Sequence, residues 1–174
     1  MSGERATAEL LRERRHRWED PLRTAAAAAD RDGLAFLRAL VAGELPPPPI
    51  AATLGFTLRY VEAGRAVFEL EPAEYHYNPI GSVHGGVYAT LLDSATGCAL
   101  HSLLPAGATY TSLDLSVKFL RAVRADTGTL TCEGTVTHLG GRTALAEARL
   151  TGPDGRLYAH ATSTLMIFRP EATT

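Results

Sequence analysis

The sequence predicts an α+β fold, in which a curved antiparallel sheet of about six strands wraps around one long central helix and follows an N-terminal helical arm. Residues 85–104 contain no proline and are long enough for a helix of about five turns. Apolar residues alternate with polar ones before and after this stretch, which indicates strands. Turn-forming residues separate these strands, as tight antiparallel connections require.

Length and composition restrict the class of protein. The chain has 174 residues, of which 45 % are hydrophobic and 21 % are charged, as expected for a folded protein with a single core. The formal net charge of −2 gives no overall positive field for nucleic acid or an anionic membrane. Cys98 and Cys132 lie far apart in apolar contexts, which favours reduced core thiols. Because no apolar run approaches the roughly 18–20 residues of a membrane span, we expect a cytoplasmic protein.

The chain is expected to divide into an N-terminal arm with a proline-rich spacer, residues 1–49, and a main domain, residues 50–170. The first part of the arm is rich in Arg and Ala, which favours partial helix. Asp32 can then cap a short helix that ends near Gly43. Pro46–Pro49 cannot continue a helix and predicts a stiff, extended spacer.

Strands are expected on both sides of the long helix. Before it, Phe56, Leu58 and Tyr60 alternate with polar residues, and an Ala63-Gly64 turn leads back into a second strand. We expect four strands after the helix, the last three being antiparallel neighbours. Those four cover residues 113–119, 129–137, 142–150 and 156–168.

Asp93 is the unusual residue of the long helix. On a helical wheel the large apolar side chains share one face, and Asp93 lies opposite among small residues. No other Asp, Glu, Lys or Arg occurs between Gly81 and Ser116 except Asp114, which predicts a buried segment. A lone carboxylate there is costly to bury unless it is hydrogen-bonded. We favour a functional role for it over a purely structural cap.

The sequence His84-Gly85-Gly86 lies where a loop becomes this helix. Unpaired backbone N–H groups at a helix start can stabilise a developing oxyanion, and glycines allow a carbonyl to approach. The same residues could equally mark a tight start of the helix. Asn78 could return towards this point through a bend, or simply form a turn. For His84 we favour a loop-orienting role over that of a general base.

Together these residues resemble a known family. Residues 78–86, Asn-Pro-Ile-Gly-Ser-Val-His-Gly-Gly, followed by Leu91-Leu92-Asp93, are similar to the pattern of PaaI-type acyl-CoA thioesterases of the hotdog-fold superfamily. The similarity extends over residues 50–168. It implies a hydrolase of acyl-CoA thioesters that needs no cofactor, with Asp93 as general base or nucleophile. The Gly85 N–H and Asn78 would then polarise the carbonyl and orient water, while His84 would support the loop.

The resemblance also implies a Ser or Thr beside the carboxylate, for which Ser112 is the first candidate and Thr111 the second. It implies homodimers or homotetramers with shared sites, in which one subunit gives the Asp and the other gives the Asn and the glycine. Gly86 and Thr111 would contact the substrate. A cationic cluster could contact the phosphates of coenzyme A or could protect a solvated strand edge. The cluster consists of Lys118, Arg121 and Arg124.

Other functions are weighed against this one. A hotdog dehydratase or hydratase would usually pair a histidine with the helix carboxylate, and His101 lies about 80° away from Asp93 on the wheel. A non-catalytic acyl-CoA sensor would use the same pocket and contact a partner through the arm, but acidic residues interleave the arginines of that arm. An α/β-hydrolase would need a Gly-x-Ser-x-Gly motif, which is absent. The histidines are scattered without metal-ligand spacing, so we expect no metal.

Overall fold

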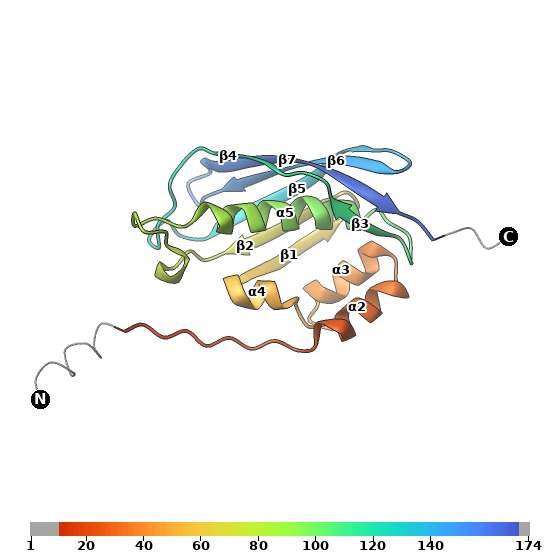
Figure 1. Cartoon of the computed structure of the whole chain (residues 1–174), viewed down its shortest axis with the longest axis horizontal. Coiled ribbons are helices and arrows are strands. Elements are labelled where there is room, and N and C mark those ends of the chain that lie inside the picture. Colours follow the sequence, from red (N-terminus) through yellow and green to blue (C-terminus); the bar gives the residue numbers. More distant parts are fainter. Residues whose placement is uncertain (1–10, 171–174) are drawn as a thin grey trace, which may run out of the picture.

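One antiparallel sheet curves around a single long helix in the computed structural model, which describes residues 11–170 (Figure 1). The helix is α5 (Gly85–His101), and the seven strands have the order β1-β2-β5-β6-β7-β3. Strand β4 also pairs with β7, at a different part of its length from β3. The predicted sheet around a central helix is confirmed, with one strand more than expected.

The extra strand is formed by residues 109–112, which were not predicted as a strand, and the strand predicted over residues 113–119 begins only at Ser116. Asp114 accepts a hydrogen bond on Oδ1 from the Thr164 N–H at 3.0 Å, and its carbonyl accepts one from the Ser163 hydroxyl at 2.8 Å. The Asp114 side chain thus binds the Thr164 N–H, which a backbone carbonyl would accept in a regular strand pair. The strands are β1 (Phe56–Glu62), β2 (Arg65–Leu70), β3 (Thr109–Ser112), β4 (Ser116–Phe119), β5 (Leu130–Leu139), β6 (Thr143–Thr151) and β7 (Leu157–Phe168).

The first strand also departs from simple alternation. The register between β1 and β2 shifts between Leu58 and Tyr60, as in a β-bulge. Val61 therefore points into the core and is 5 % exposed, whereas Tyr60 is 46 % exposed. The expectation that Tyr60 shares a face with Phe56 and Leu58 is wrong for this reason.

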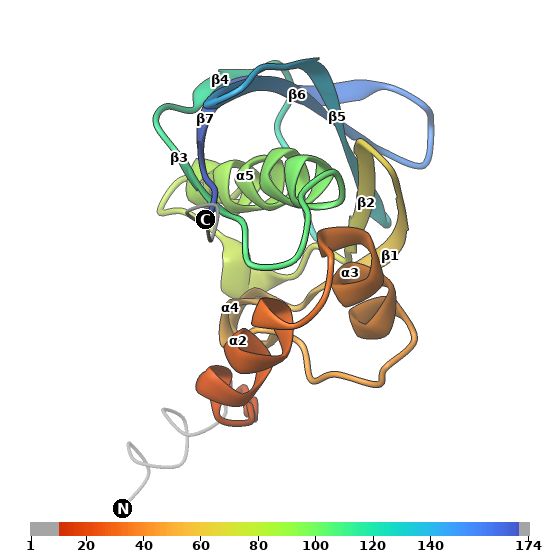
Figure 2. The same ribbon diagram turned by 90° about the vertical axis from the view of Figure 1, so that its right-hand side faces the viewer.

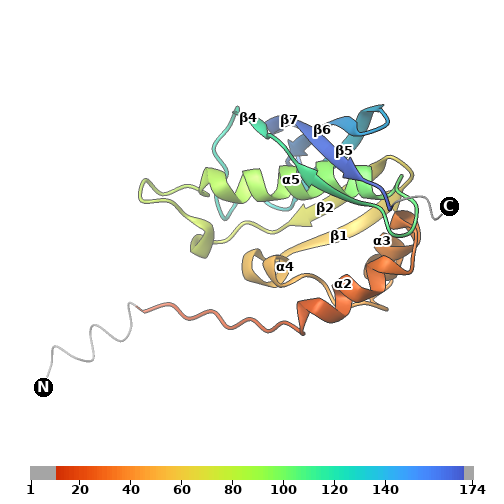
Figure 3. The ribbon, with the colours of Figure 1, turned by 45° about the vertical axis from the view of Figure 1, so that its right-hand side comes forward.

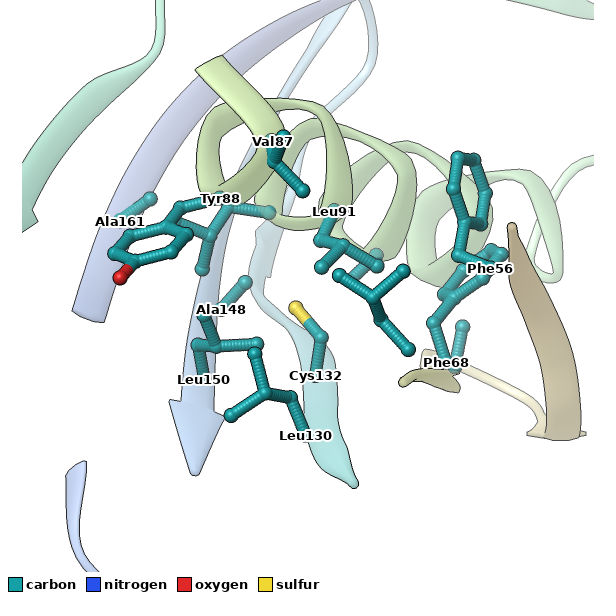
Figure 4. Close-up of a cluster of buried hydrophobic side chains, with 14 of the residues drawn as sticks. Phe56, Phe68, Val87, Tyr88, Leu91, Leu130, Cys132, Ala148, Leu150 and Ala161 are labelled. Atoms are coloured by element: carbon teal, nitrogen blue, oxygen red, sulfur yellow. The ribbon is translucent and has the colours of Figure 1, made fainter. Parts of the chain in front are cut away.

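The central helix lies directly on the sheet. Its buried face includes Leu91, Leu92 and Ala95, and Figure 4 shows Leu91 directed towards side chains of β5 and β6. A Cβ atom on Gly134 of β5 would lie 2.3 Å from the carbonyl carbon of Ala95, so only glycine permits this approach. The helix ends at His101, three residues before the predicted end at Leu104.

Three shorter helices lie on the side of α5 that the sheet does not cover (Figures 2 and 3). They are α2 (Pro21–Ala29), α3 (Gly33–Val41) and α4 (Pro49–Leu54). The predicted cap of α3 is confirmed, because Asp32 accepts a hydrogen bond from the Ala35 N–H at 2.8 Å. Phe36 and Leu37 of α3 join the main hydrophobic cluster.

Helix α4 is absent from the sequence prediction. Pro49 takes a first-turn position, where the missing N–H costs no hydrogen bond, so the proline-rich spacer ends in a helix. Of the arm, residues 11–20 are not helical, and residues 1–10 lie outside the described part of the chain. Within residues 11–170 no helix has the length and hydropathy needed to cross a membrane.

Candidate active site

The Asp93 carboxylate is held by a strand from the same chain. The Ser112 hydroxyl, on β3, donates a hydrogen bond to Asp93 Oδ1 at 2.8 Å. Successive side chains of a strand point to opposite faces, so Thr111 points away from α5. Of the two hydroxyl residues suggested by the sequence, the structure therefore brings Ser112 to the carboxylate.

The expectation of burial around Asp93 is wrong for the carboxylate of a single chain. Asp93 is exposed, whereas Thr96 and Gly97, which the sequence placed near it, are buried. A strand residue that the sequence did not single out covers this part of the helix: Tyr110 lies so close that a Cβ on Gly97 would be 2.8 Å from its hydroxyl. The signal for Tyr110 was its position two residues before Ser112, on the same face of β3.

The phenol group of Tyr110 has a shifted pKa. Burial, together with the nearby Cys98 and Asp93, raises the pKa of Tyr110 well above its ordinary value. The phenol therefore stays protonated and neutral beside the helix. Its ring also packs on His101, with 5.6 Å between ring centroids, and the Phe36 ring packs on the same imidazole at 5.4 Å. Burial lowers the pKa of His101.

The start of α5 presents one free backbone donor. His84 is the N-cap residue, and its Nδ1 accepts a hydrogen bond from the Gly86 N–H at 2.8 Å. The Val87 N–H donates to the His84 carbonyl at 2.9 Å. For the Gly85 N–H, by contrast, residues 11–170 supply no hydrogen-bond acceptor. The first turn thus directs a single unpaired N–H outward.

Asn78 shapes the loop before the helix. Its side-chain Oδ1 accepts hydrogen bonds from the N–H groups of Ile80 at 3.0 Å and Ser82 at 3.2 Å. Its Nδ2 donates to the Ser82 hydroxyl at 3.1 Å. The turn-forming role considered from the sequence is therefore present, and one amide hydrogen remains for another partner. Ile80, at the tip of this loop, is 87 % exposed.

A hollow of about 390 Å³ adjoins the helix start. The Tyr88 hydroxyl accepts a hydrogen bond from the Val123 N–H at 2.8 Å, which fixes the segment after β4 beside α5. Arg121 lines the hollow, whereas Lys118 and Arg124 are exposed residues outside its lining. The lining residues are Ser82, Val83, Gly85, Tyr88 and the run from Phe119 to Ala122.

Gly85 and Asp93 are too far apart on one helix to act together. They are separated by eight residues, which corresponds to about 12 Å along the helix axis. Groups that act on one reacting carbon must each lie within about 3–3.5 Å of the atoms they contact. A single chain therefore cannot present both groups to the same carbonyl.

The described residues offer no obvious metal centre. Within residues 11–170, no group of three or more His, Cys, Asp or Glu side chains is arranged to hold a metal ion. The two cysteines, Cys98 and Cys132, are free thiols in separate elements.

Comparisons with known proteins place the chain in a family. A family model described as the thioesterase superfamily matches residues 80–159. The phenylacetic acid degradation-related protein of Ralstonia eutropha, a crystal structure described as that of a thioesterase, is 32 % identical, with a TM-score of 0.68. That alignment covers 75 % of this chain and 98 % of the other. The chain therefore belongs to the thioesterase superfamily, and its fold is the hotdog fold of the PaaI-type thioesterases.

Other relatives match over different lengths. A Halobacterium salinarum protein named as an esterase is 39 % identical over 75 residues, which cover 42 % of this chain and only 48 % of that protein. The 1,4-dihydroxy-2-naphthoyl-CoA hydrolase of Listeria monocytogenes is 27 % identical over 115 residues, covering 66 % of this chain and 92 % of the hydrolase. A thioesterase protein of Streptococcus pneumoniae, solved with coenzyme A, is 26 % identical, covers 67 % and 88 % of the two chains, and has a TM-score of 0.61.

Proposed function

We propose that this protein hydrolyses acyl-coenzyme A thioesters to the free acid and coenzyme A. The observation that carries the proposal is the exposed carboxylate of Asp93 on the central helix of a thioesterase fold. The Ser112 hydroxyl of β3 orients this carboxylate by a hydrogen bond. The coenzyme A bound to the Streptococcus pneumoniae protein and the name of the Listeria monocytogenes hydrolase support a coenzyme A thioester as the substrate.

Asp93 drives the attack on the thioester carbonyl. As general base it removes a proton from water, whose oxygen bonds to the carbonyl carbon while the carbon–sulfur bond breaks. As nucleophile it bonds to that carbon itself, releases the thiolate and forms an anhydride, which water then cleaves. In both routes the thiolate takes up a proton that originates from water. Ser112 occupies Oδ1, which leaves Oδ2 for either role.

The carbonyl oxygen is stabilised by a second copy of the chain. Because one helix separates Gly85 from Asp93 by about 12 Å, the thioester lies between Asp93 of one subunit and Gly85 of the partner subunit. The free Gly85 N–H donates to the developing oxyanion. The remaining amide hydrogen of Asn78 helps to orient the carbonyl or the water, and His84 keeps the first turn in shape. The active protein is thus a homodimer or a homotetramer.

The hollow at the helix start is the proposed approach for coenzyme A. Gly85 and Arg121 both line it, and the Arg121 guanidinium, which donates from Nη1 to the Leu157 carbonyl, keeps its other N–H groups for the phosphates of coenzyme A. Guanidinium groups bind phosphate oxygens with two parallel hydrogen bonds. Lys118 of β4 and Arg124, both exposed and on either side of Arg121 in the sequence, extend the positive charge.

Thiol release from a panel of acyl-CoAs tests this function. We expect hydrolysis by the wild type and a fall in kcat of roughly 10³-fold in Asp93→Asn, because the amide neither accepts the proton nor attacks. Asp126→Asn, in an exposed turn, is the matched control and should retain activity. Equal melting temperatures would show that both variants fold. Unchanged turnover in Asp93→Asn would remove Asp93 from the mechanism.

A further inference from the structure

An apolar pocket of about 360 Å³ lies beside the C-terminal half of α5, away from the helix start. The N-terminal segment and α4 form one wall of this pocket, and β1, β2 and α5 form the other. The first wall includes Leu40, Pro47, Pro48, Ala51 and Ala52. The second includes Phe56, Leu58, Phe68 and Cys98.

The lining of this pocket carries no charge. Its lining residues include no Asp, Glu, Lys, Arg or His, and the only polar side chains are the Thr57 hydroxyl and the Cys98 thiol. Burial, together with the nearby Asp93, raises the pKa of the Cys98 thiol to about 12, so the thiol stays neutral at ordinary pH. Transfer of a charged group into such surroundings without a partner is strongly unfavourable.

The pocket and the proposed catalytic carboxylate lie on different faces of α5, yet Asp93 is close enough to help raise the pKa of the Cys98 thiol. Cys98 follows Asp93 by five residues, which places it about 7.5 Å further along the axis of α5 and about 140° round that axis. The step runs towards the C-terminal end of the helix, away from the hollow at Gly85. Ser94, half-buried, lies between the two side chains on the helix surface. An acyl group that extends from a thioester at Asp93 into the pocket therefore passes round α5 over Ser94.

We propose that this pocket binds the acyl group of the substrate, that the acyl group is uncharged and apolar, and that the subunit supplying Asp93 also supplies the pocket. The inference rests on the proposed thioester hydrolysis and adds its substrate class. Because one water takes up about 30 Å³ in the liquid, the pocket holds on the order of ten heavy-atom groups at most. This size admits a medium-length aliphatic chain or an aromatic ring.

The N-terminal wall of the pocket is fixed in place before substrate binds. Arg14 donates a hydrogen bond from Nη2 to the Ala52 carbonyl at 3.0 Å, and its Nη1 donates to the Thr53 carbonyl. The guanidinium also stacks on Tyr75, with 4.0 Å to the ring centroid. The two prolines of the wall restrict the backbone further. A preformed wall lowers the entropy that binding has to offset.

Filling the pocket should change the preference for the acyl group. We expect Ala52→Phe to lower the ratio of kcat/KM for hexanoyl-CoA to that for acetyl-CoA by roughly tenfold or more, because the larger acyl group loses its space. Ala29→Phe, in a separate cavity beside α2, is the matched control and should leave the ratio unchanged. Cys98→Met narrows the pocket from the opposite wall, so a failure of one variant to fold leaves the other.

A charged substrate of similar length gives a second readout. We expect the wild type to prefer hexanoyl-CoA over glutaryl-CoA by roughly tenfold or more in kcat/KM, because the pocket offers no partner for a terminal carboxylate. Equal rates on these two substrates, or an unchanged hexanoyl to acetyl ratio in both folded filling variants, would overturn the acyl pocket and leave thioester hydrolysis standing. Hydrolysis of none of the acyl-CoAs would overturn both proposals.

Discussion

The first turn and the middle of α5 carry the two halves of the proposed site, and the chain completes them differently. In the middle of the helix, Asp93 already has its partner, because Ser112 donates to it within the same chain. In the first turn, the Gly86 N–H is satisfied by His84, while the Gly85 N–H is not satisfied by residues 11–170. One chain thus holds the two halves about 12 Å apart, and in the proposed mechanism a second copy of the chain brings them together.

Among changes to the first turn of α5, removal of the free Gly85 N–H should lower activity the most. Gly85→Pro removes this N–H at a helix position that favours proline, and His84 already has an extended backbone with φ −63° and ψ 137°. We expect kcat to fall roughly 10²–10³-fold with little change in melting temperature. Gly85→Ala is the matched control, because its Cβ meets the same Phe119 ring at 3.2 Å while the N–H remains. Equal activity in the two variants would exclude this donor.

Mixed dimers test whether the two halves belong to different subunits. Asp93→Asn and Gly85→Pro should each be nearly inactive alone. Random pairing of the two variants gives half heterodimers, each with one intact site, so about a quarter of the wild-type activity should return under two-fold symmetry. Thiol release is measured after coexpression of the two chains. If a heterodimer forms and no activity returns, both groups act within one subunit or not at all.

Removing the partner of the carboxylate should have a smaller effect. Ser112→Ala deletes one hydrogen bond to a charged oxygen, which corresponds to a fall of roughly tenfold in kcat/KM. Thr111→Val on the opposite face of β3 is the control and should change kcat/KM little. A larger loss in the threonine variant than in the serine variant would reverse the assignment of these two residues.

The smallest expected effect concerns stability and pH. Burial, helped by Arg14, lowers the pKa of His76 below its model-compound value of 6.5. The neutral ring accepts from the Ala73 N–H on Nδ1 and bonds to the Leu54 carbonyl through Nε2. As pH falls below about 6.5 the unfolded chain binds the proton first, so the free energy of unfolding decreases.

Thermal melting between about pH 7.5 and pH 5 measures this dependence. We expect His76→Gln to be less stable than the wild type at neutral pH but to lose less stability on acidification. His138→Gln, at an exposed position, should follow the wild type. A wild-type melting temperature that rises on acidification would contradict the assignment. His101, whose pKa is also lowered by burial, acts in the same direction.

Local periodicity explains how much of the fold was predictable. The start of α5 at Gly85 and the last three strands follow from hydrophobic patterns and turn residues within each segment. The break at Asp114 depends on Thr164, fifty residues away, and the irregularity near Tyr60 depends on pairing with β2. Neither leaves a signal in its own segment, so both were missed.

The features of the candidate site also separate into those that local sequence predicts and those that depend on distant residues. The position of Asp93 on a helix and of Ser112 on the following strand followed from the sequence and the resemblance, and their contact is present in the structure. The exposure of Asp93 and the cover provided by Tyr110 depend on tertiary packing, and the sequence did not give them. The apolar pocket combines residues from segments that are distant in the sequence, so no local sequence pattern predicts it.

The contact of Gly134 with Ala95 limits how this protein can evolve. Since a side chain at position 134 would collide with the helix backbone, α5 keeps one height and one rotation above the sheet. Descendants of this chain can hardly re-aim the carboxylate by turning the helix. Residues of the N-terminal wall can, however, be exchanged without moving α5, so if the proposed acyl pocket is correct, new acyl preferences should arise there first.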